Sequence, residues 1–266
     1  MGGYAGTAAG TGGATSMGDN AGTGCTGGFE EMQDTSGLCV AKMATIAGPV
    51  GQSDFGIDVT EVTQGQYDAW LATKPALPAS TDPNCGYVES YAEQGAGYTG
   101  TDADHHPVVY VDWCDAYAYC LGVGKRLCGA IGGGGYDGDY EDATRSQWYR
   151  ACSSGGAYRY PYGNTFQPSY CDGSELWNGD PSTFETVAVG SLPNCVTSAA
   201  GYAGVYDLLG NVDEWEDGCD GPGRSAWCCS RGGSFVNSDG SLNCGCGYDI
   251  VRYEANSVAG FRCCSR

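Results

Sequence analysis

Apolar and polar residues alternate over residues 55–63, with the period of two that is typical of a β-strand. Over residues 64–73 the period changes, because Tyr67, Trp70 and Leu71 recur at helical spacing. The pattern therefore predicts a strand that leads directly into a helix.

The same order of elements recurs further along the chain. Residues 106–112 predict a second strand, residues 113–122 a second amphipathic helix, and residues 146–152 a third, short helix. After these come only turns and short strands, the last of them at residues 231–235 and 259–263. Short elements separated by Gly-rich and Pro-rich loops predict one domain of short helices and strands.

The stretch from residue 201 to residue 217 combines an apolar turn with a run of acids. Leu208 and Leu209 can anchor it in a core, while the pair Gly210-Asn211 favours a turn. Five carboxylates crowd one short loop, and like charges repel unless a cation lies between them. These are Asp207, Asp213, Glu214, Glu216 and Asp217. Because calcium binds carboxylates together with backbone carbonyls, the segment is either a calcium loop or a solvated acidic loop.

Composition narrows the possible partners. The chain has 266 residues, of which 41% are hydrophobic, so it can bury a sizeable core. Its net charge of −20 repels nucleic acid and anionic membrane surfaces. No apolar run reaches the length of about 18 residues that a membrane span needs, and the start of the sequence predicts no secretory signal within this numbering.

Cysteine usage points to an oxidising compartment. The sixteen cysteines are scattered and include no CxxC pair, the usual arrangement of zinc ligands. An even number of cysteines in an acidic, Lys-poor chain predicts a disulfide framework. We therefore expect an extracellular or cell-surface protein.

Residues 1–24 differ from the rest of the chain. They consist almost entirely of Gly, Ala, Thr and Ser, which bury too little apolar area to offset their ordering entropy. We predict an extended arm at residues 1–24 and a single domain at residues 25–266. The arm either docks on a neighbouring copy or lies along its own domain, and its candidate contact residues are Tyr4, Thr7, Thr11 and Thr15. Its hydroxyls, including Ser16 and Thr23, are candidates for O-glycosylation.

Eight short motifs occur in a characteristic order between residues 39 and 266. They are Ile57–Thr63, His106–Cys120, Gly124–Leu127, Tyr160–Asn164, Val189–Ser191, Tyr206–Trp215, Arg231–Phe235 and Gly260–Cys263. In this series the chain resembles the formylglycine-generating enzyme, or sulfatase-modifying factor, family, and in its cysteine content it is similar to secreted deltaproteobacterial members. The resemblance implies an irregular, loop-rich α+β fold related to the C-type lectin fold and stabilised by calcium.

The resemblance also implies particular site residues. The calcium ligands would be the carboxylates of Asp207 and Glu214 and the carbonyls of Gly210 and Val212, with Asp213 standing where the family usually has a tryptophan. A second family calcium site would lie near Asp172 and Asp180, where the alignment is poor. Structural disulfides would join Cys120 to Cys263 and Cys152 to Cys244. Lys125 and Arg126 would form ion pairs with nearby acids.

Catalytic chemistry is where the chain departs from the family. The oxidase uses a copper-binding cysteine pair after the Gly-Gly-Ser-aromatic strand, but here residues 236–243 contain no cysteine, so copper is not expected. The two histidines, His105 and His106, are adjacent and are followed by Pro107. An adjacent pair of histidines cannot build an iron-binding triad or supply a serine triad. The glycine run at residues 132–139 lacks the flanking strand and helix of a phosphate-binding loop.

Three functions remain open. The first is a secreted, non-catalytic structural subunit of an assembly or filament, in which the arm of one copy docks on the next. The second is a copper-dependent formylglycine-generating oxidase with a displaced site that uses Cys246. The third is a lectin-like binder of glycans or proteins, since 19 Tyr and 6 Trp can stack on sugar rings as well as fill a core.

Overall fold

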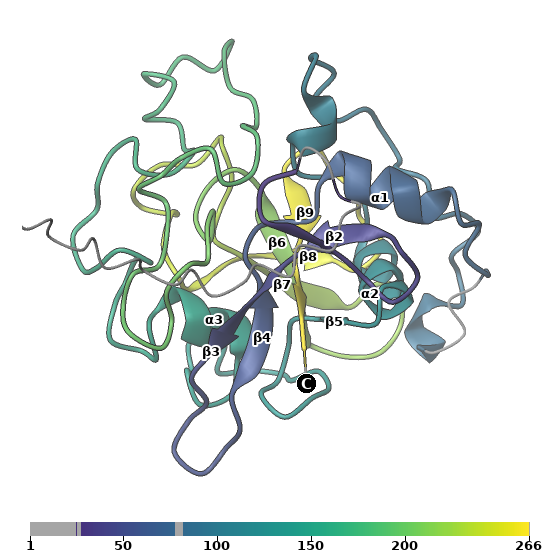
Figure 1. The fold of residues 1–266 in the computed structure, drawn as a ribbon, viewed down its shortest axis with the longest axis horizontal. Helices are drawn as coiled ribbons and strands as arrows, with labels where there is room; N and C mark the ends of the chain where they lie inside the picture. The colour runs from purple at the N-terminus through teal and green to yellow at the C-terminus, as the bar shows by residue number, and fades with distance from the viewer. Residues whose placement is uncertain (1–24, 26–27, 78–81, 266) are drawn as a thin grey trace, which may run out of the picture.

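The computed structural model describes residue 25, residues 28–77 and residues 82–265 (Figure 1). The predicted arm at residues 1–24, with Tyr4, Thr7, Thr11 and Thr15, lies outside these described residues. The first sheet of the described chain is a small antiparallel pair, β1 (Glu31–Gln33) and β2 (Cys39–Ala41). It precedes two four-stranded sheets that build the body of the domain.

The second sheet brings the two ends of the domain together. Its strand order is β3-β4-β10-β5, so the last strand of the chain lies between an N-terminal hairpin and a strand from the middle. Cys264 pairs with Ile57 on one side and with Arg126 on the other. The strands are β3 (Met43–Ile46), β4 (Phe55–Asp58), β5 (Arg126–Leu127) and β10 (Cys263–Cys264).

The third sheet has β6 in an interior position. Its order is β8-β7-β6-β9, in which β6 is antiparallel to β7 and parallel to β9. The strands are β6 (Asp213–Cys219), β7 (Trp227–Arg231), β8 (Cys246–Val251) and β9 (Ala259–Phe261). The acid-rich segment predicted as a loop is therefore largely a strand, held on both edges by neighbours.

Three helices begin at side-chain caps. Thr63 and Asp112 form capping boxes at the starts of α1 (Gln64–Leu71) and α2 (Trp113–Gly122), and Ser146 caps α3 (Gln147–Cys152). Two short 3₁₀ turns, η1 (Pro83–Cys85) and η2 (Ala103–His105), lie in the long connection between α1 and α2. The predicted helices are confirmed, with boundaries shifted by one or two residues.

Three predicted strands are shorter or absent. The strand expected at residues 55–63 ends at Asp58, residues 106–112 form no strand beyond an isolated bridge between Thr63 and Pro107, and of residues 231–235 only Arg231 lies in a strand, β7. The first two segments are nevertheless largely buried and hydrogen-bonded: the Val62 N–H donates to the Phe261 carbonyl, and the Val108 N–H donates to the Val62 carbonyl. The alternation of apolar residues in the sequence reflects burial of these segments. Burial does not require the continuous ladder of backbone hydrogen bonds that defines a β-strand.

Two hydrophobic cores lie on either side of the acidic strand. One contains Trp215 and Trp113, and the other contains Trp148 and Leu208. Trp215 leaves β6 on the side of the first core, where its indole N–H donates to the Val111 carbonyl at 3.0 Å. Because side chains alternate along a strand, Glu214 and Glu216 share the opposite side.

Eight disulfides join all sixteen cysteines, as is typical of proteins from an oxidising compartment. Cys120–Cys263 ties α2 to β10, and Cys152–Cys244 ties α3 to the segment before β8. The remaining pairs are Cys25–Cys39, Cys85–Cys114, Cys128–Cys264, Cys171–Cys195, Cys219–Cys228 and Cys229–Cys246.

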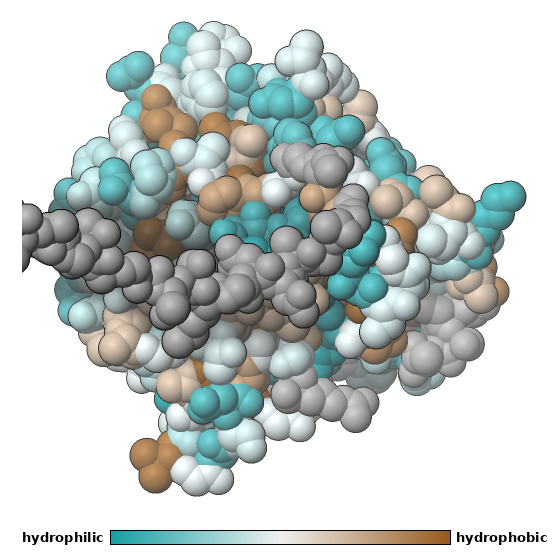
Figure 2. Space-filling model, in the orientation of Figure 1, coloured by the Kyte–Doolittle hydropathy of each residue, from teal (hydrophilic) through white to brown (hydrophobic). Residues whose placement is uncertain are grey.

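The surface shown in Figure 2 mixes hydrophilic and hydrophobic residues. Single exposed apolar side chains such as Val50, in the turn between β3 and β4, are ordinary for a folded domain. Among the described residues, no helix has both the length and the apolar character needed to cross a bilayer.

Loss of the long-range disulfides should destabilise the domain more than loss of a local one. Cys120 and Cys263 are 143 positions apart, whereas Cys25 and Cys39 are 14 apart. Cys128–Cys264 closes almost the same loop, so the two bridges to β10 have to be removed together. In the loop-entropy description, replacing these four cysteines by serines lowers the free energy of unfolding by about 5 kcal/mol or more, and replacing Cys25 and Cys39 by about 3 kcal/mol. Urea unfolding of the two variants tests this, and a larger loss in the Cys25/Cys39 variant would contradict it.

Candidate functional site

The turn before β6 is built from residues in the left-handed region of backbone space. Asp207, Gly210 and Asn211 have φ of 54°, 70° and 59°. Glycine is required at position 210, because a Cβ there would lie 2.1 Å from the carbonyl oxygen of Asp172. The Asn211 N–H donates to the same carbonyl at 2.8 Å. This contact fixes where the carbonyls of the turn point relative to Asp207 and β6.

Glu214 is fully buried and paired with an arginine. Nε and Nη2 of Arg262 donate to its two carboxylate oxygens, both at 2.7 Å, and the Trp148 indole N–H donates at 2.8 Å. The side chain of Arg262 is itself fully buried, and its Nη1 donates to the Asp58 carbonyl. A bidentate guanidinium pair of this kind holds the carboxylate in one orientation.

Glu216 repeats the arrangement two residues further along the same face. Nε of Arg231 donates to its carboxylate at 2.6 Å, and the hydroxyls of Tyr136 and Ser146 donate at 2.8 Å and 2.7 Å. Two of the five crowded acids are thus neutralised by arginines from β7 and from the residue between β9 and β10. For Glu214 and Glu216, arginine side chains supply the positive charge that the sequence analysis expected from a metal.

Two further buried carboxylates have no such partner. Asp207 accepts a hydrogen bond from the Gly190 N–H at 2.6 Å, and neither carboxylate oxygen of the fully buried Glu61 has a hydrogen-bond partner among the described residues. Burial raises the pKa of Asp207 to about 7 despite the nearby charge of Arg262. Burial and then the charge of Asp207 raise the pKa of Glu61 well above its ordinary value.

This excess of negative charge fits a bound cation. Three buried carboxylates, Glu61, Asp207 and Glu214, share one guanidinium, that of Arg262. Glu214 offers about four lone-pair positions and uses three of them for Arg262 and Trp148, which leaves one for a metal. Together with Asp207 and the carbonyls of Gly210 and Val212, this is the all-oxygen donor set that calcium prefers.

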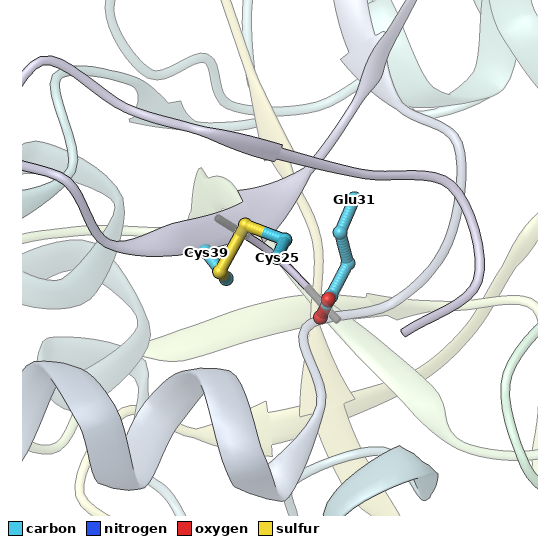
Figure 3. A group of neighbouring side chains, drawn as sticks. All are labelled: Cys25, Glu31 and Cys39. Carbon is cyan, nitrogen blue, oxygen red and sulfur yellow. A yellow bond between two sulfur atoms is a disulfide. The ribbon is translucent and has the colours of Figure 1, made fainter. Parts of the chain in front are cut away.

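Another group of potential ligands is not a metal site. Within the described chain, the only three Cys, His, Asp or Glu side chains whose ligand atoms all lie within 4.8 Å of one another are Cys25, Glu31 and Cys39. Figure 3 shows the two sulfurs joined in a disulfide beside the Glu31 carboxylate, which accepts a hydrogen bond from Gln66 at 2.8 Å. A calcium ion bound by Asp207 and Glu214 would therefore depend on the backbone carbonyls for its remaining ligands.

The segment that would hold the family's catalytic cysteines is residues 236–243, here named the plug. Leu242 is 2% exposed and lies between Gly173 and Gly233, where an added Cβ would come within 2.3 Å and 3.0 Å of its methyl groups. Oδ1 of Asn237 accepts hydrogen bonds from the backbone N–H and the hydroxyl of Ser234 at 2.8 Å and 3.0 Å. Leu242 and Asn237 thus anchor the plug, while Val236 and residues 238–240 are exposed.

Asp213, the departure from the family pattern, lies beside this plug. It is 4% exposed, and burial raises its pKa to about 7 although hydrogen bonds from Ser230 and Ser234 lower it. The Ser230 hydroxyl lies 3.4 Å from its carboxylate. The extra acid therefore faces the interior and does not point to solvent.

The other predicted polar residues have structural environments. His106 stacks on Tyr98 with ring centroids 3.7 Å apart, and its Nδ1 lies 2.8 Å from the Thr186 hydroxyl. Oδ1 of the buried Asp172 accepts from the Trp177 indole, but its buried Oδ2 has no hydrogen-bond partner among the described residues, so a second calcium site there stays a prediction. Asp180 is exposed and accepts from Ser182. The predicted ion pairs of the Lys125-Arg126 turn are present, with Asp58 and Asp217.

Sequence reasoning did not single out Glu61 and Arg262. Glu61 falls on the same alternate positions as the apolar residues at 55, 57 and 59, and an acid on the apolar side of such a pattern signals a buried charge. Arg262 belongs to the motif Gly260–Cys263, where its neighbours are also buried. A search for charges at positions where the pattern expects apolar residues would have found both residues, although not their proximity.

Comparison with known proteins identifies the family. Residues 11–266 match the sulfatase-modifying factor enzyme 1-like domain, so the chain belongs to this family of formylglycine-generating enzymes. It is 34% identical to the formylglycine-generating enzyme of Thermomonospora curvata over 47% of this chain and 37% of that protein. It is also 34% identical to the inactive C-alpha-formylglycine-generating enzyme 2 of Mus musculus, over 52% of this chain and 40% of that protein.

Solved structures show the same fold. CarF superposes with a TM-score of 0.52 at 24% identity, covering 80% of this chain and 86% of CarF. Treponema denticola variable protein 1 superposes with a TM-score of 0.51 at 19% identity, covering 86% and 95% of the two chains. The predicted α+β, loop-rich fold of the formylglycine-generating enzymes is confirmed. The matches to the two curated relatives cover only about two fifths of their lengths.

Calcium binding at the turn before β6 should stabilise the domain. An ion that binds only the folded chain raises the free energy of unfolding by about 2.7 kcal/mol when its concentration is 100 times the dissociation constant. In Asp207→Asn this increment should be largely lost, since one of its two proposed carboxylate ligands is removed. Asp68→Asn, which changes an exposed acid on α1, is the matched control. Thermal unfolding with and without a chelator tests the site. A melting temperature of the wild type that is unchanged by calcium would exclude a calcium site at this turn.

Proposed function

We propose that this chain is an exported, catalytically silent member of its family that serves as a structural subunit of an extracellular assembly. The observation that carries the proposal is the replacement of the catalytic cysteine pair by the cysteine-free plug at residues 236–243. Leu242 and Asn237 fill this position with apolar packing and hydrogen bonds to Ser234. The fold is kept while the chemistry that needs a thiolate is lost.

The state of the other cysteines supports the same proposal. Copper(I) in a thiolate site requires deprotonated, unbridged cysteines. Cys246, the next cysteine after the structural Cys244, is joined to Cys229. With all sixteen cysteines in disulfides, a displaced oxidase site would have to break one of the bridges that hold the sheet together.

A structural role also accounts for the many disulfides and buried ion pairs that stabilise the domain. Eight disulfides and two fully buried arginine-carboxylate pairs hold a domain of short strands. Such cross-linking suits a module that persists outside the cell, where reducing systems are absent. The Gly/Ala/Thr-rich segment at residues 1–24 is our candidate for the contact between copies, through main-chain hydrogen bonds to a neighbour.

The absence of oxidase activity can be measured directly. A cysteine-containing sulfatase peptide incubated aerobically with this protein and copper(I) should show no conversion to formylglycine by mass spectrometry. The Thermomonospora curvata enzyme serves as the positive control under the same conditions. Copper-dependent product that disappears in Cys246→Ser would overturn the proposal and establish the displaced oxidase.

Assembly through the arm is tested by truncation. The chain of residues 25–266 keeps the eight disulfides and both cores, so it should unfold at nearly the same urea concentration as the full chain. Light scattering should show the full chain as an oligomer or filament and the truncated chain as a monomer. Equal assembly of both chains would remove the arm from the proposal.

A further inference from the structure

A polar cavity of about 450 Å³ is lined by residues that belong neither to the plug nor to the turn before β6. Its volume falls within the range of about 300–1,000 Å³ that is typical of small-molecule sites. Its walls come from the loop after η1, the start of α2, the loop between β6 and β7, and the end of β8. The residues that matter most are Tyr87, Glu89, Gln94, Asp112, Arg224 and Tyr253.

Disulfides brace two of these walls. Cys85–Cys114 joins the loop that carries Tyr87 to the first turn of α2, and Cys219–Cys228 closes the loop that carries Arg224. Neither bridge is among the two that the family resemblance implied. Cross-links at a cavity reduce the conformational entropy that a ligand must remove on binding, so they favour a preorganised site.

Hydrogen bonds hold the same walls. Arg252 is 3% exposed, and its guanidinium donates to the carbonyls of Gly221 and Gly223 at 3.3 Å and 2.6 Å. The Gly223 N–H donates to the Asn84 side chain at 2.7 Å, which connects the two loops across the cavity. The Tyr87 hydroxyl donates to Asp112 at 3.1 Å. The positions of both loops are therefore set before any ligand arrives.

Arg224 is held by aromatic rings. Its guanidinium carbon lies 5.1 Å from the ring centroid of Tyr87 and 4.8 Å from that of Tyr253. Within the described chain it makes no hydrogen bond or ion pair, so its N–H donors remain available. Cation–π contacts thus fix the orientation of the arginine and leave its edge free for a ligand.

The chemistry of the lining favours a ligand with many hydroxyls. Arg224 and Gln94 supply donors, Glu89 supplies a carboxylate acceptor, and Tyr253, which is 43% exposed, supplies an aromatic surface. The carboxylate of Asp112 is already occupied by the cap of α2 and by the Tyr87 hydroxyl. A sugar ring combines hydroxyls that both donate and accept with a C–H face that packs on an aromatic ring. Two carboxylates against one arginine, in a chain of net charge −20, disfavour an anionic ligand.

We infer that the cavity between Tyr87, Arg224 and Tyr253 is a binding site for a neutral saccharide. The sugar packs against the part of the Tyr253 ring that Arg224 leaves exposed, and its hydroxyls are bridged between the free edge of the Arg224 guanidinium and the carboxylate of Glu89. This site goes beyond the proposed structural role. Saccharide binding there depends neither on assembly through residues 1–24 nor on whether residues 236–243 support catalysis.

Saturation-transfer NMR with neutral mono- and disaccharides tests the site on the full chain. Glucose, galactose, mannose, N-acetylglucosamine, cellobiose and lactose form the panel, and glucuronate and an acidic decapeptide are the comparison ligands. We expect saturation transfer to at least one neutral sugar, followed by a dissociation constant from calorimetry. Tyr253→Ala and Arg224→Gln should each weaken that binding at least tenfold.

Arg159→Gln is the matched control. Arg159 also stacks on a tyrosine, Tyr160, at 5.4 Å, but it lies outside the cavity. This variant should bind the sugar like the wild type, and circular dichroism confirms that all three variants are folded. Absence of saturation transfer to every neutral sugar, binding only of glucuronate or the peptide, or sugar binding unchanged in folded Tyr253→Ala and Arg224→Gln would each overturn the inference.

Discussion

Burial of carboxylates on one face of β6 is the constraint on which the rest of the structure depends. Glu214 and Glu216 are fully buried. Glu214 pairs with the buried Arg262, and Glu216 pairs with the buried Arg231. Loss of one partner from such a pair costs about 3–5 kcal/mol, because the other charge is left uncompensated. The C-terminal residues must therefore return to the centre of the domain, and β9 and β10 pair there with β6 and β4.

This arrangement explains how a chain with so little regular secondary structure stays folded. The strands are short and much of the backbone is irregular, so ladder hydrogen bonds alone hold few segments together. Disulfides replace them at the points where distant segments meet: Cys120–Cys263 and Cys128–Cys264 both end on β10, beside Arg262. Covalent and ionic links thus converge on the same C-terminal residues.

In the function that we propose, the family frame is kept without the family chemistry. The turn before β6 has acids and carbonyls that suit a hard cation, whereas the interval after Arg231-Gly-Gly-Ser-Phe235 contains Leu242 and Asn237 and no cysteine. The proposed saccharide site lies in the loops around Arg224, which two disulfides outside the family resemblance brace. A rigid frame can carry binding sites on its loops independently of catalysis.

Local patterns in the sequence determined the three helices, because caps at Thr63, Asp112 and Ser146 act within one turn. Ordered motifs determined the family, and the number of cysteines determined a disulfide-rich protein. Only the tertiary structure decided that the crowded acids form a strand paired with arginines, and that Glu61 lies buried beside Asp207. Arg262 and Glu214 are 48 positions apart, and no periodicity in a sequence reports a contact over such a distance. The same reason hid the cavity at Arg224, whose walls come from four separate segments that meet only in the folded chain.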